Sequence, residues 1–336
     1  MSGLFRWIAV AVALVASPMA HAEGGKPIKI GFQTGEINVI LSYALATGMF
    51  EKAGLDVKTA QFPAGPAMLP ALAASEVDLA WMGEFPAVTG YSNGLPIEIL
   101  FMERIDATNV RLAANPQAGI NGLPDLKGKR IGVAIGSTSH FHTLQALAKA
   151  NLKASDVTLV NLTPANMPPA YQAGQIDAAF VWEPNVGAIE RAGAKPIATT
   201  KSLGMITGGV WVARKAFTSG SPETVHTFLK VWEQAQADYK AKPADIRQYE
   251  AKRVNMTPAD FDKLVEGQSV AHPSFAEILT ADFMGPPGAE ADSRLGKHLQ
   301  RIAAFLLEEK RIQSVPTDWS GLLNTKPVQA YLASQK

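Results

Sequence analysis

Three adjacent hydroxyl side chains follow the expected end of a strand in the second third of the chain. Ser137, Thr138 and Ser139 come directly after Gly136, where an apolar run ends and a helical pattern begins. The free N–H groups in the first turn of a helix bind anions, and the helix dipole and nearby hydroxyl groups add to this. The group therefore predicts a seat for a small anion. Ordinary capping of the helix by Ser137 or Thr138 is the alternative.

A similar polar pair follows the first expected strand. Gln33 and Thr34 come after the apolar residues 28–32. The amide of Gln33 offers both a donor and an acceptor, which would orient a polar ligand. We therefore treat Gln33 and Thr34 as candidate ligand residues. A loop amide that faces water is the alternative.

Two carboxylates occupy corresponding positions after two other strands. Glu84 and Phe85 follow one strand, and Trp182 and Glu183 follow another, with Pro184 suited to the first helical position. Glu84 could simply stabilise a helix N-terminus, but beside a bound anion it would require a ligand that also carries a positive group. Trp182 offers a flat apolar wall with an N–H donor, or else belongs to the core. A buried carboxylate without a partner is costly, so at least one should face a positive group or open water.

The histidines and the absence of cysteine argue against catalysis and metal binding. His140 and His142 are two residues apart, so their rings point to different sides of a helix. No orienting acid can be named for Ser137 and His140 as a nucleophile pair. The chain has no cysteine, which removes disulfides, thiolate chemistry and cysteine metal sites. We expect no catalytic residue, cofactor or metal, although His140 could reach a ligand from the first helical turn.

The elements that position these residues alternate between strand and helix patterns, and the pattern occurs twice. The first set has strands at 28–32, 55–62, 77–81 and 97–102, with helices at 37–50, 67–74 and 85–92. The second has strands at 130–134, 157–162 and 176–181, with helices at 138–150, 167–173 and 184–192. Strands separated by helices of this length predict two α/β units, each with a largely parallel sheet.

The remainder of the chain is almost wholly helical in its periodicity. Apolar residues recur at helical intervals over 226–241, 258–266 and 293–310, and no strand set remains for a third sheet. This segment must therefore pack on the first unit, which requires the chain to cross back near 206–212. Crossings near 99–111 and 203–211 would form a hinge. Ligands of open α/β sheets bind at the carboxyl ends of the strands, which here would face each other across a cleft.

The N-terminus has the pattern of an export signal. Arg6 precedes an apolar run of about ten residues, and Ala20-His21-Ala22 provides a small-x-small cleavage site. An uncleaved anchor is the alternative, although spanning a bilayer takes about 20 residues. Removal of residues 1–22 takes away one of the 31 basic residues and leaves 30 against 30 acidic ones. This balance argues against nucleic acid as a partner.

Several of these segments resemble the taurine and alkanesulfonate branch of the periplasmic solute-binding proteins of ABC importers. The resemblance covers nearly the whole chain after residue 22 and is strongest at 128–140, 160–164, 174–182 and 210–215. It implies a two-lobed type II binding fold that closes on its ligand and delivers it to an inner-membrane ABC permease. The implied division is a signal peptide at 1–22, lobe 1 at 26–105 and 207–336, and lobe 2 at 106–206. It also implies a periplasmic monomer.

This chain departs from the family at two places. Relatives carry small hydroxyl residues where Glu84 and Phe85 stand, and the taurine-binding proteins carry an acidic residue where Gly209 stands. Either Glu84 or Glu183 recognises a ligand amine, or the ligand lacks an amine there and is bulkier than taurine. Gly208 and Gly209 would leave room for such bulk, with Trp211 lining the same space. A three-oxygen sulfonate suits the hydroxyl seat at residues 137–139.

Other functions remain open at this point. The ligand could be another small anion, such as nitrate or an aromatic carboxylate. The family fold is also similar to that of enzymes of thiamine-pyrimidine synthesis, which need a reactive histidine and metal-binding residues. A chemotaxis or sensor-kinase module would bind ligand identically but dock elsewhere.

Overall fold

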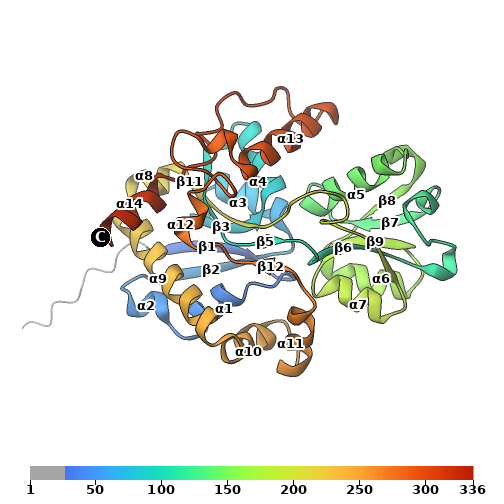
Figure 1. Cartoon of the computed structure of the whole chain (residues 1–336), viewed down its shortest axis with the longest axis horizontal. Helices are drawn as coiled ribbons and strands as arrows, with labels where there is room; N and C mark the ends of the chain where they lie inside the picture. Colours follow the sequence, from blue (N-terminus) through green and yellow to red (C-terminus); the bar gives the residue numbers. More distant parts are fainter. Residues whose placement is uncertain (1–26, 336) are drawn as a thin grey trace, which may run out of the picture.

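The structure is a computed structural model that describes residues 27–335. Two five-stranded sheets lie in separate lobes, and a two-stranded sheet lies near the connection between them (Figure 1). The signal peptide predicted for residues 1–22 lies outside the described residues. Between residues 27 and 335, no helix is both long and apolar enough to cross a bilayer.

The first sheet combines the four strands of the first α/β unit with one strand from much later in the chain. Its order is β2 (Val57–Phe62), β1 (Ile28–Gln33), β3 (Leu79–Gly83), β11 (Gly209–Arg214) and β4 (Ile97–Met102). β1 pairs in parallel with both neighbours, whereas β11 runs antiparallel to β3 and β4. The sequence predicts a return of the chain near 206–212, and β11 makes that return inside the sheet.

Four helices connect the strands of this first sheet. They are α1 (Val39–Ala46), α2 (Met49–Lys52), α3 (Met68–Ala73) and α4 (Glu84–Ser92). The single helix predicted over 37–50 is in fact two helices, because Gly48 between them adopts a left-handed conformation with φ of 66°. Glycine enters that conformation without steric cost, so the chain changes direction there.

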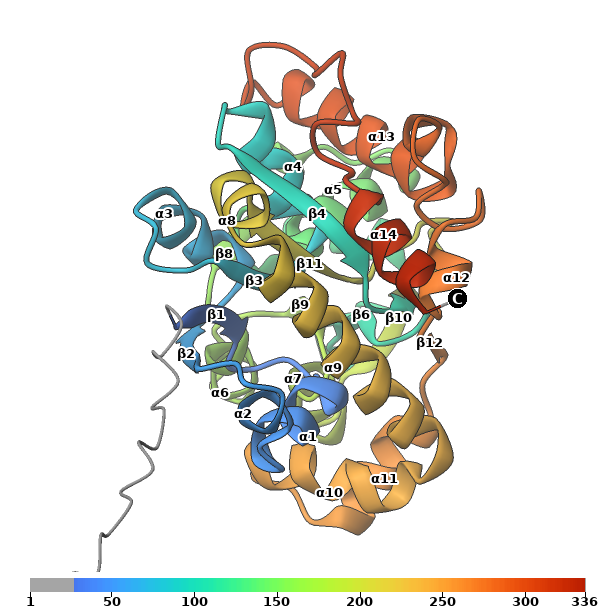
Figure 2. The same cartoon turned by 90° about the vertical axis from the view of Figure 1, so that its left-hand side faces the viewer.

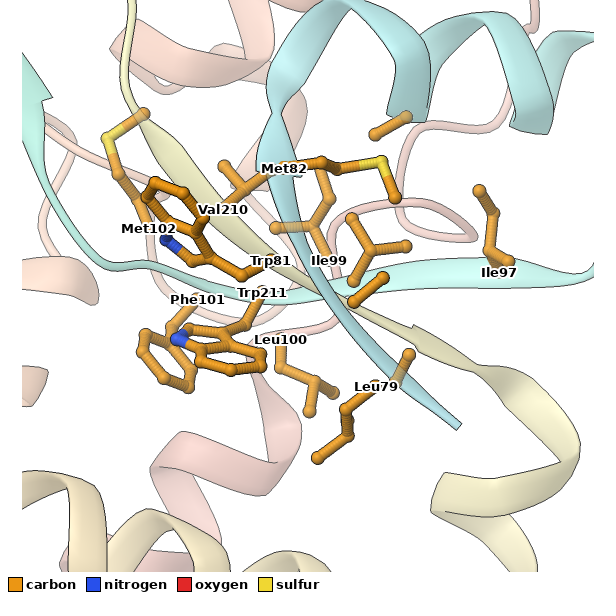
Figure 3. Close-up of a cluster of buried hydrophobic side chains, with 14 of the residues drawn as sticks. Leu79, Trp81, Met82, Ile97, Ile99, Leu100, Phe101, Met102, Val210 and Trp211 are labelled. Atoms are coloured by element: carbon orange, nitrogen blue, oxygen red, sulfur yellow. The ribbon is translucent and has the colours of Figure 1, made fainter. Parts of the chain in front are cut away.

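Large aromatic side chains fill the core of the first lobe (Figure 3). Trp81 on β3, Phe101 on β4 and Trp211 on β11 are each at most 1% exposed. These strands read as nearly continuous apolar runs because both faces of the sheet are covered. Trp211 also packs edge-on against Trp232 of the helix α9 (Pro222–Ala241), with 5.2 Å between ring centroids.

The second sheet forms the second lobe. Its order is β10 (Lys195–Thr199), β6 (Val110–Ala114), β9 (Ala178–Trp182), β7 (Arg130–Val133) and β8 (Thr158–Asn161). The helices α5 (Thr138–Lys149), α6 (Met167–Gln172) and α7 (Asn185–Arg191) connect its strands. β7 pairs in parallel with β8 and β9, as predicted, but β6 runs antiparallel to β9 and β10. Both large sheets are therefore mixed, and each contains a strand that directly follows a crossing.

The prediction that no strands remain for a third sheet is wrong. β5 (Ile105–Asp106) pairs antiparallel with β12 (Val270–Ala271). Two residues per strand are too few for a periodic pattern to reveal. Asp106 also forms an isolated antiparallel bridge with Thr207. The two crossings between the lobes therefore lie side by side, and the C-terminal segment is attached to one of them.

The helical C-terminal segment packs on lobe 1, as predicted (Figures 1 and 2). Besides α9 it comprises α8 (Lys215–Gly220), α10 (Pro243–Arg253), α11 (Pro258–Glu266), α12 (Phe275–Ile278), α13 (Arg294–Glu308) and α14 (Lys326–Ser334). In α13, Leu295, Leu299, Ile302 and Leu306 are buried at helical spacing, which gives the helix one apolar face. Short 3₁₀ turns lie at Gly65–Ala67, Pro116–Ala118, Leu123–Leu126, Ala154–Asp156, Pro164–Asn166 and Glu290–Asp292.

Candidate functional site

A small cavity lies between the lobes, where the carboxyl ends of β1, β3, β7 and β9 converge. Its volume is about 20 Å³, which is room for about one water molecule. Its walls are Gln33, Glu36, Gly65, Gly83, Pro86, Asp106, Val110, Ser137, Thr138, Trp182, Thr207 and Gly208. Four of these, Gln33, Ser137, Thr138 and Trp182, are predicted from the sequence. The cavity therefore lies at the carboxyl ends of the strands, where ligands of open α/β sheets bind.

The hydroxyl groups at the start of α5 leave this helix N-terminus without a side-chain cap. Ser137 occupies the N-cap position, but its hydroxyl donates to the carbonyl of Ala134 at 2.7 Å instead. Thr138 Oγ1 is buried and has no hydrogen-bond partner among the described residues. A Cβ atom on Gly83 would lie only 2.5 Å from that oxygen. The geometry therefore favours the anion-seat interpretation over side-chain capping.

Ser139 and His140 lie behind the cavity wall. Ser139 is fully buried, and its hydroxyl lies 2.9 Å from that of Ser137. The ring of His140 turns away, because Nδ1 accepts from the N–H of Gly136 at 3.4 Å and lies 3.2 Å from Arg311 Nη1. Burial, and then the charge of Arg311, lowers the pKa of His140 to about 4. A neutral His140 thus positions the loop before α5 and does not reach the cavity.

On the opposite wall, Gln33 is joined by a carboxylate that sequence reasoning missed. The Gln33 amide donates to Glu36 Oε2, and both residues line the cavity. Thr34 is exposed, and its hydroxyl donates to the carbonyl of Phe62 at 3.4 Å. Thr34 is therefore not part of the cavity wall.

A buried charge cluster, consisting of Glu36, Glu103, Arg104 and Asp106, joins this wall to the first crossing. Arg104 donates to Glu36 Oε1 at 2.5 Å and to Asp106 Oδ2 at 2.9 Å. Its guanidinium also lies over the ring of Trp81, 4.7 Å from the centroid. One guanidinium thus faces three carboxylates, so the cluster carries an excess of negative charge where Glu36 and Asp106 are both ionised.

The protonation of this cluster follows from its burial. Burial raises the pKa of Glu36 to about 7, against the attraction of Arg104, which lowers it. Burial raises the pKa of Asp106 as well, and Arg104 again opposes the shift. For Arg104, burial lowers the pKa, but the surrounding carboxylates outweigh it and the pKa is raised overall. Glu36 therefore titrates near neutral pH.

The two carboxylates predicted from the sequence have partners within the protein. Glu84 is fully buried, lies 3.4 Å from His298 Nε2 and accepts from the N–H of Gly208 at 3.4 Å. Glu183 lies 2.5 Å from Arg111 Nη2 and accepts from the N–H of Gly187 at 3.1 Å. The expectation that one of them faces a positive group is confirmed for Glu183. Neither lines the cavity.

The room expected beside Gly208 and Gly209 is absent, which corrects the sequence-based interpretation. A Cβ atom on Gly209 would lie 2.6 Å from Trp81 Nε1, and one on Gly208 would lie 2.0 Å from the carbonyl oxygen of Arg104. The space is filled by the Trp81 ring and by the backbone of the first crossing. These glycines admit close packing and offer no room to a bulky ligand.

Trp211 and Phe85 are also corrected, because both belong to the core. Trp211 is fully buried beside Phe101, with 6.4 Å between ring centroids (Figure 3). Phe85 is fully buried and stacks on Phe141 of α5 at 5.5 Å. Phe141 belongs to the second lobe in sequence, yet it packs within the core cluster of the first. This contact joins α4 and α5 across the two lobes.

Polar contacts also join the lobes at the cavity rim. Trp182 Nε1 and Asn185 Nδ2 each donate to the carbonyl oxygen of Gly35 at 3.0 Å. Both donors belong to the second lobe and the acceptor to the first. Trp182 therefore lines the cavity with its ring and bonds the opposite lobe with its N–H.

The charged residues of the cavity wall that the sequence analysis does not include also lie just after the ends of strands. Glu36 is three residues past the end of β1, and Glu103, Arg104 and Asp106 follow the fully buried strand β4. Three charged residues directly after an apolar strand are a signal for the carboxyl edge of the sheet. Among residues 27–335, no cluster of histidine, aspartate or glutamate is arranged to hold a metal ion.

Comparisons with known proteins identify relatives of this chain and of its fold. The chain is 31% identical over 319 residues to the taurine-binding periplasmic protein of Escherichia coli K12, covering 89% of this chain and 95% of that protein. The fold resembles that of the alkanesulfonate-binding protein of Xanthomonas axonopodis pv. citri bound to MOPS, with a TM-score of 0.70, 23% identity and coverage of 91% and 99%.

A second solved structure and a family model give the same result. The periplasmic aliphatic sulphonate binding protein of Escherichia coli has a TM-score of 0.69 at 21% identity, with 89% of this chain and 99% of that one covered. The two-lobed binding-protein fold predicted from the sequence is thus confirmed. Residues 38–246 match the family model described as NMT1/THI5 like. The chain belongs to the NMT1/THI5-like family.

Proposed function

We propose that this chain is the solute-binding component of an ABC importer and that it captures a small sulfonate between its lobes. The observation that carries the proposal is the start of α5, where a helix N-terminus and the Thr138 hydroxyl face the cavity, neither with a side-chain partner among residues 27–335. A sulfonate is ionised at any physiological pH and has three acceptor oxygens. Neutral donors of this kind can hold it without a counter-cation.

The opposite wall favours a ligand that also carries an amine. Glu36 and Asp106 line the cavity across from Thr138, and the cluster to which they belong has surplus negative charge. A taurine-like aminosulfonate would place its sulfonate at α5 and its ammonium toward Glu36. The amine partner in this chain is therefore Glu36 and not the residue at position 209, which is glycine.

We further propose the division of the chain and its location. Residues 1–22 form a cleaved export signal and deliver the protein to the periplasm. Lobe 1 comprises residues 26–105 and 207–336, and lobe 2 comprises residues 106–206. The membership of β1–β4 and β11 in one sheet, and of β6–β10 in the other, supports these bounds. The protein acts as a monomer, hands its ligand to an inner-membrane permease, and performs no chemistry on it.

The proposal is tested by calorimetric titration with taurine, pentanesulfonate and nitrate. We expect both sulfonates to bind, taurine more tightly at pH 8 than pentanesulfonate, and nitrate weakly. Thr138→Val should weaken sulfonate binding roughly 10- to 100-fold, because a hydrogen bond to a charged group contributes about 1.5–3 kcal/mol.

The matched control is Thr143→Val on the same helix. Thr143 is fully buried, and its hydroxyl donates to the carbonyl of Ser139 at 2.8 Å, away from the cavity. Its loss should leave sulfonate affinity within about twofold. Equal effects of the two substitutions would contradict the anion seat. Binding of nitrate without binding of either sulfonate would contradict the ligand class.

A further inference from the structure

A second and larger cavity lies beside the hinge, between helices of the first lobe and the first crossing. Its volume is about 610 Å³, within the range of roughly 300–1,000 Å³ that is typical of small-molecule sites. It is lined by residues of α9, α10, the segment from α11 to α12, the start of α1 and the first crossing. We call it the hinge pocket. It shares only Asp106 with the walls of the cavity between the lobes.

Buried polar atoms without partners line the inner end of the hinge pocket. Asn109 is 2% exposed, and neither its amide nitrogen nor its amide oxygen has a hydrogen-bond partner among the described residues. Asp106 is 3% exposed; Oδ2 accepts from Arg104, whereas Oδ1 has no partner within residues 27–335. Buried polar groups in native proteins are nearly always hydrogen-bonded. These atoms therefore indicate a polar group bound at this end.

The charges around this end favour a cation. Glu36, Glu103 and Asp106 surround the guanidinium of Arg104, and the ring of His272 lies 3.0 Å from Glu103. An ammonium group has three donors and no acceptor, so it could bond Asp106 Oδ1 and Asn109 Oδ1 together. An anion in the same position would meet the surplus carboxylates.

Another part of the pocket wall suits an apolar body. Apolar side chains form much of its wall, contributed by Ile37, Val39, Val265 and Val270. The charged residues at its mouth are of both signs and are partly paired within the protein. Arg247 lies 3.3 Å from Asp262, and Glu233 accepts from the hydroxyl of Tyr331 at 2.5 Å.

We propose that the hinge pocket is a second binding site, which takes a small organic ammonium compound with its amine at Asp106 and Asn109 and its apolar body toward Val265. This site is separate from the sulfonate seat and does not depend on it. Its ligand is defined by chemistry alone: a primary amine on a compact aliphatic or aromatic body.

The test is calorimetric titration of the full mature chain with benzylammonium chloride, with benzyl alcohol and phenylacetate as neutral and anionic probes of similar shape. We expect benzylammonium to bind at least tenfold more tightly than either. Ala237→Trp places an indole in the mouth of the pocket at an exposed position of α9, so it should fold normally and abolish binding. Asn109→Leu should weaken binding at least tenfold.

Controls separate this site from the cavity between the lobes. Thr138→Val should leave benzylammonium binding unchanged while it weakens taurine, and Ala237→Trp should leave taurine binding unchanged. Three results would each overturn the proposal. They are benzyl alcohol binding as tightly as benzylammonium, benzylammonium binding undiminished to Ala237→Trp, and no binding of benzylammonium at millimolar concentration. Loss of benzylammonium binding in Thr138→Val alone would place the amine between the lobes and also overturn it. Failure of taurine to bind would contradict only the proposed aminosulfonate ligand of the cavity between the lobes.

Discussion

Glu36 lies in the wall of the cavity between the lobes, where burial makes its negative charge costly. This cost affects the stability of the protein as well as ligand binding. Its pKa is raised to about 7 because burial outweighs the attraction of Arg104. Between pH 4.5 and 7 the folded protein thus holds a proton that the unfolded chain releases. By linkage, the free energy of unfolding falls as the pH rises through this window.

We predict that Glu36→Gln removes part of this fall. The effect is a few kcal/mol at most, since one pKa unit corresponds to about 1.4 kcal/mol, and Asp106 contributes in the same direction. Urea unfolding of both proteins between pH 4.5 and 8 measures it. The exposed residue Glu76 supplies the control substitution Glu76→Gln. Parallel pH profiles for wild type and Glu36→Gln would show that Glu36 titrates normally.

The sequence predicts that a residue lines the cavity only where its position directly after a strand is enough to place it there. Ser137, Thr138, Gln33 and Trp182 line the cavity because strand ends converge there. A position after a strand does not show which side chains point inward, so the sequence predicts Glu84 and Glu183 as ligand residues and not Glu36. Their partners, His298 and Arg111, come from distant parts of the chain, and only the folded structure brings them together.

At the level of elements, the start of α7 and the end of β9 hold the lobes together through Gly35. We predict that Trp182→Phe, which keeps the ring and removes the N–H donor, weakens taurine binding roughly fivefold. This follows from the loss of one hydrogen bond worth about 1 kcal/mol. Calorimetry measures the change, and Trp319→Phe, which alters a tryptophan buried in the first lobe's core, is the control. Unchanged affinity in Trp182→Phe would mean that this contact does not favour the closed state.

Elements with a long periodic pattern were predicted well, and those defined by tertiary pairing were not. α11 covers 258–266 as expected, because its apolar spacing is regular. β6 and β11 are not among the strands that the sequence predicts, and each overlaps only the end of a predicted crossing. Each becomes a strand because it lies between partners contributed by other parts of the chain. Local sequence carries little of that information.

For the whole molecule, the closed arrangement of the lobes implies an equilibrium with an open one. A cavity of about 20 Å³ is smaller than any organic sulfonate, so the lobes must separate to admit one. We predict that saturating taurine reduces the radius of gyration of the protein in solution. Small-angle scattering with and without taurine measures this, at several protein concentrations to confirm a monomer. An unchanged radius at saturation would contradict closure around the ligand.

The position of β11 has a consequence for the order in which the protein is built. β3 and β4 are joined only through β11, which is made after the whole second sheet. As the chain emerges from the ribosome, residues 110–199 can complete their sheet while β4 still lacks a strand partner. The first sheet, and the aromatic core around Trp211, cannot close until residue 214 has appeared. Synthesis thus leaves the larger lobe unfinished until residue 214 of 336 has been made.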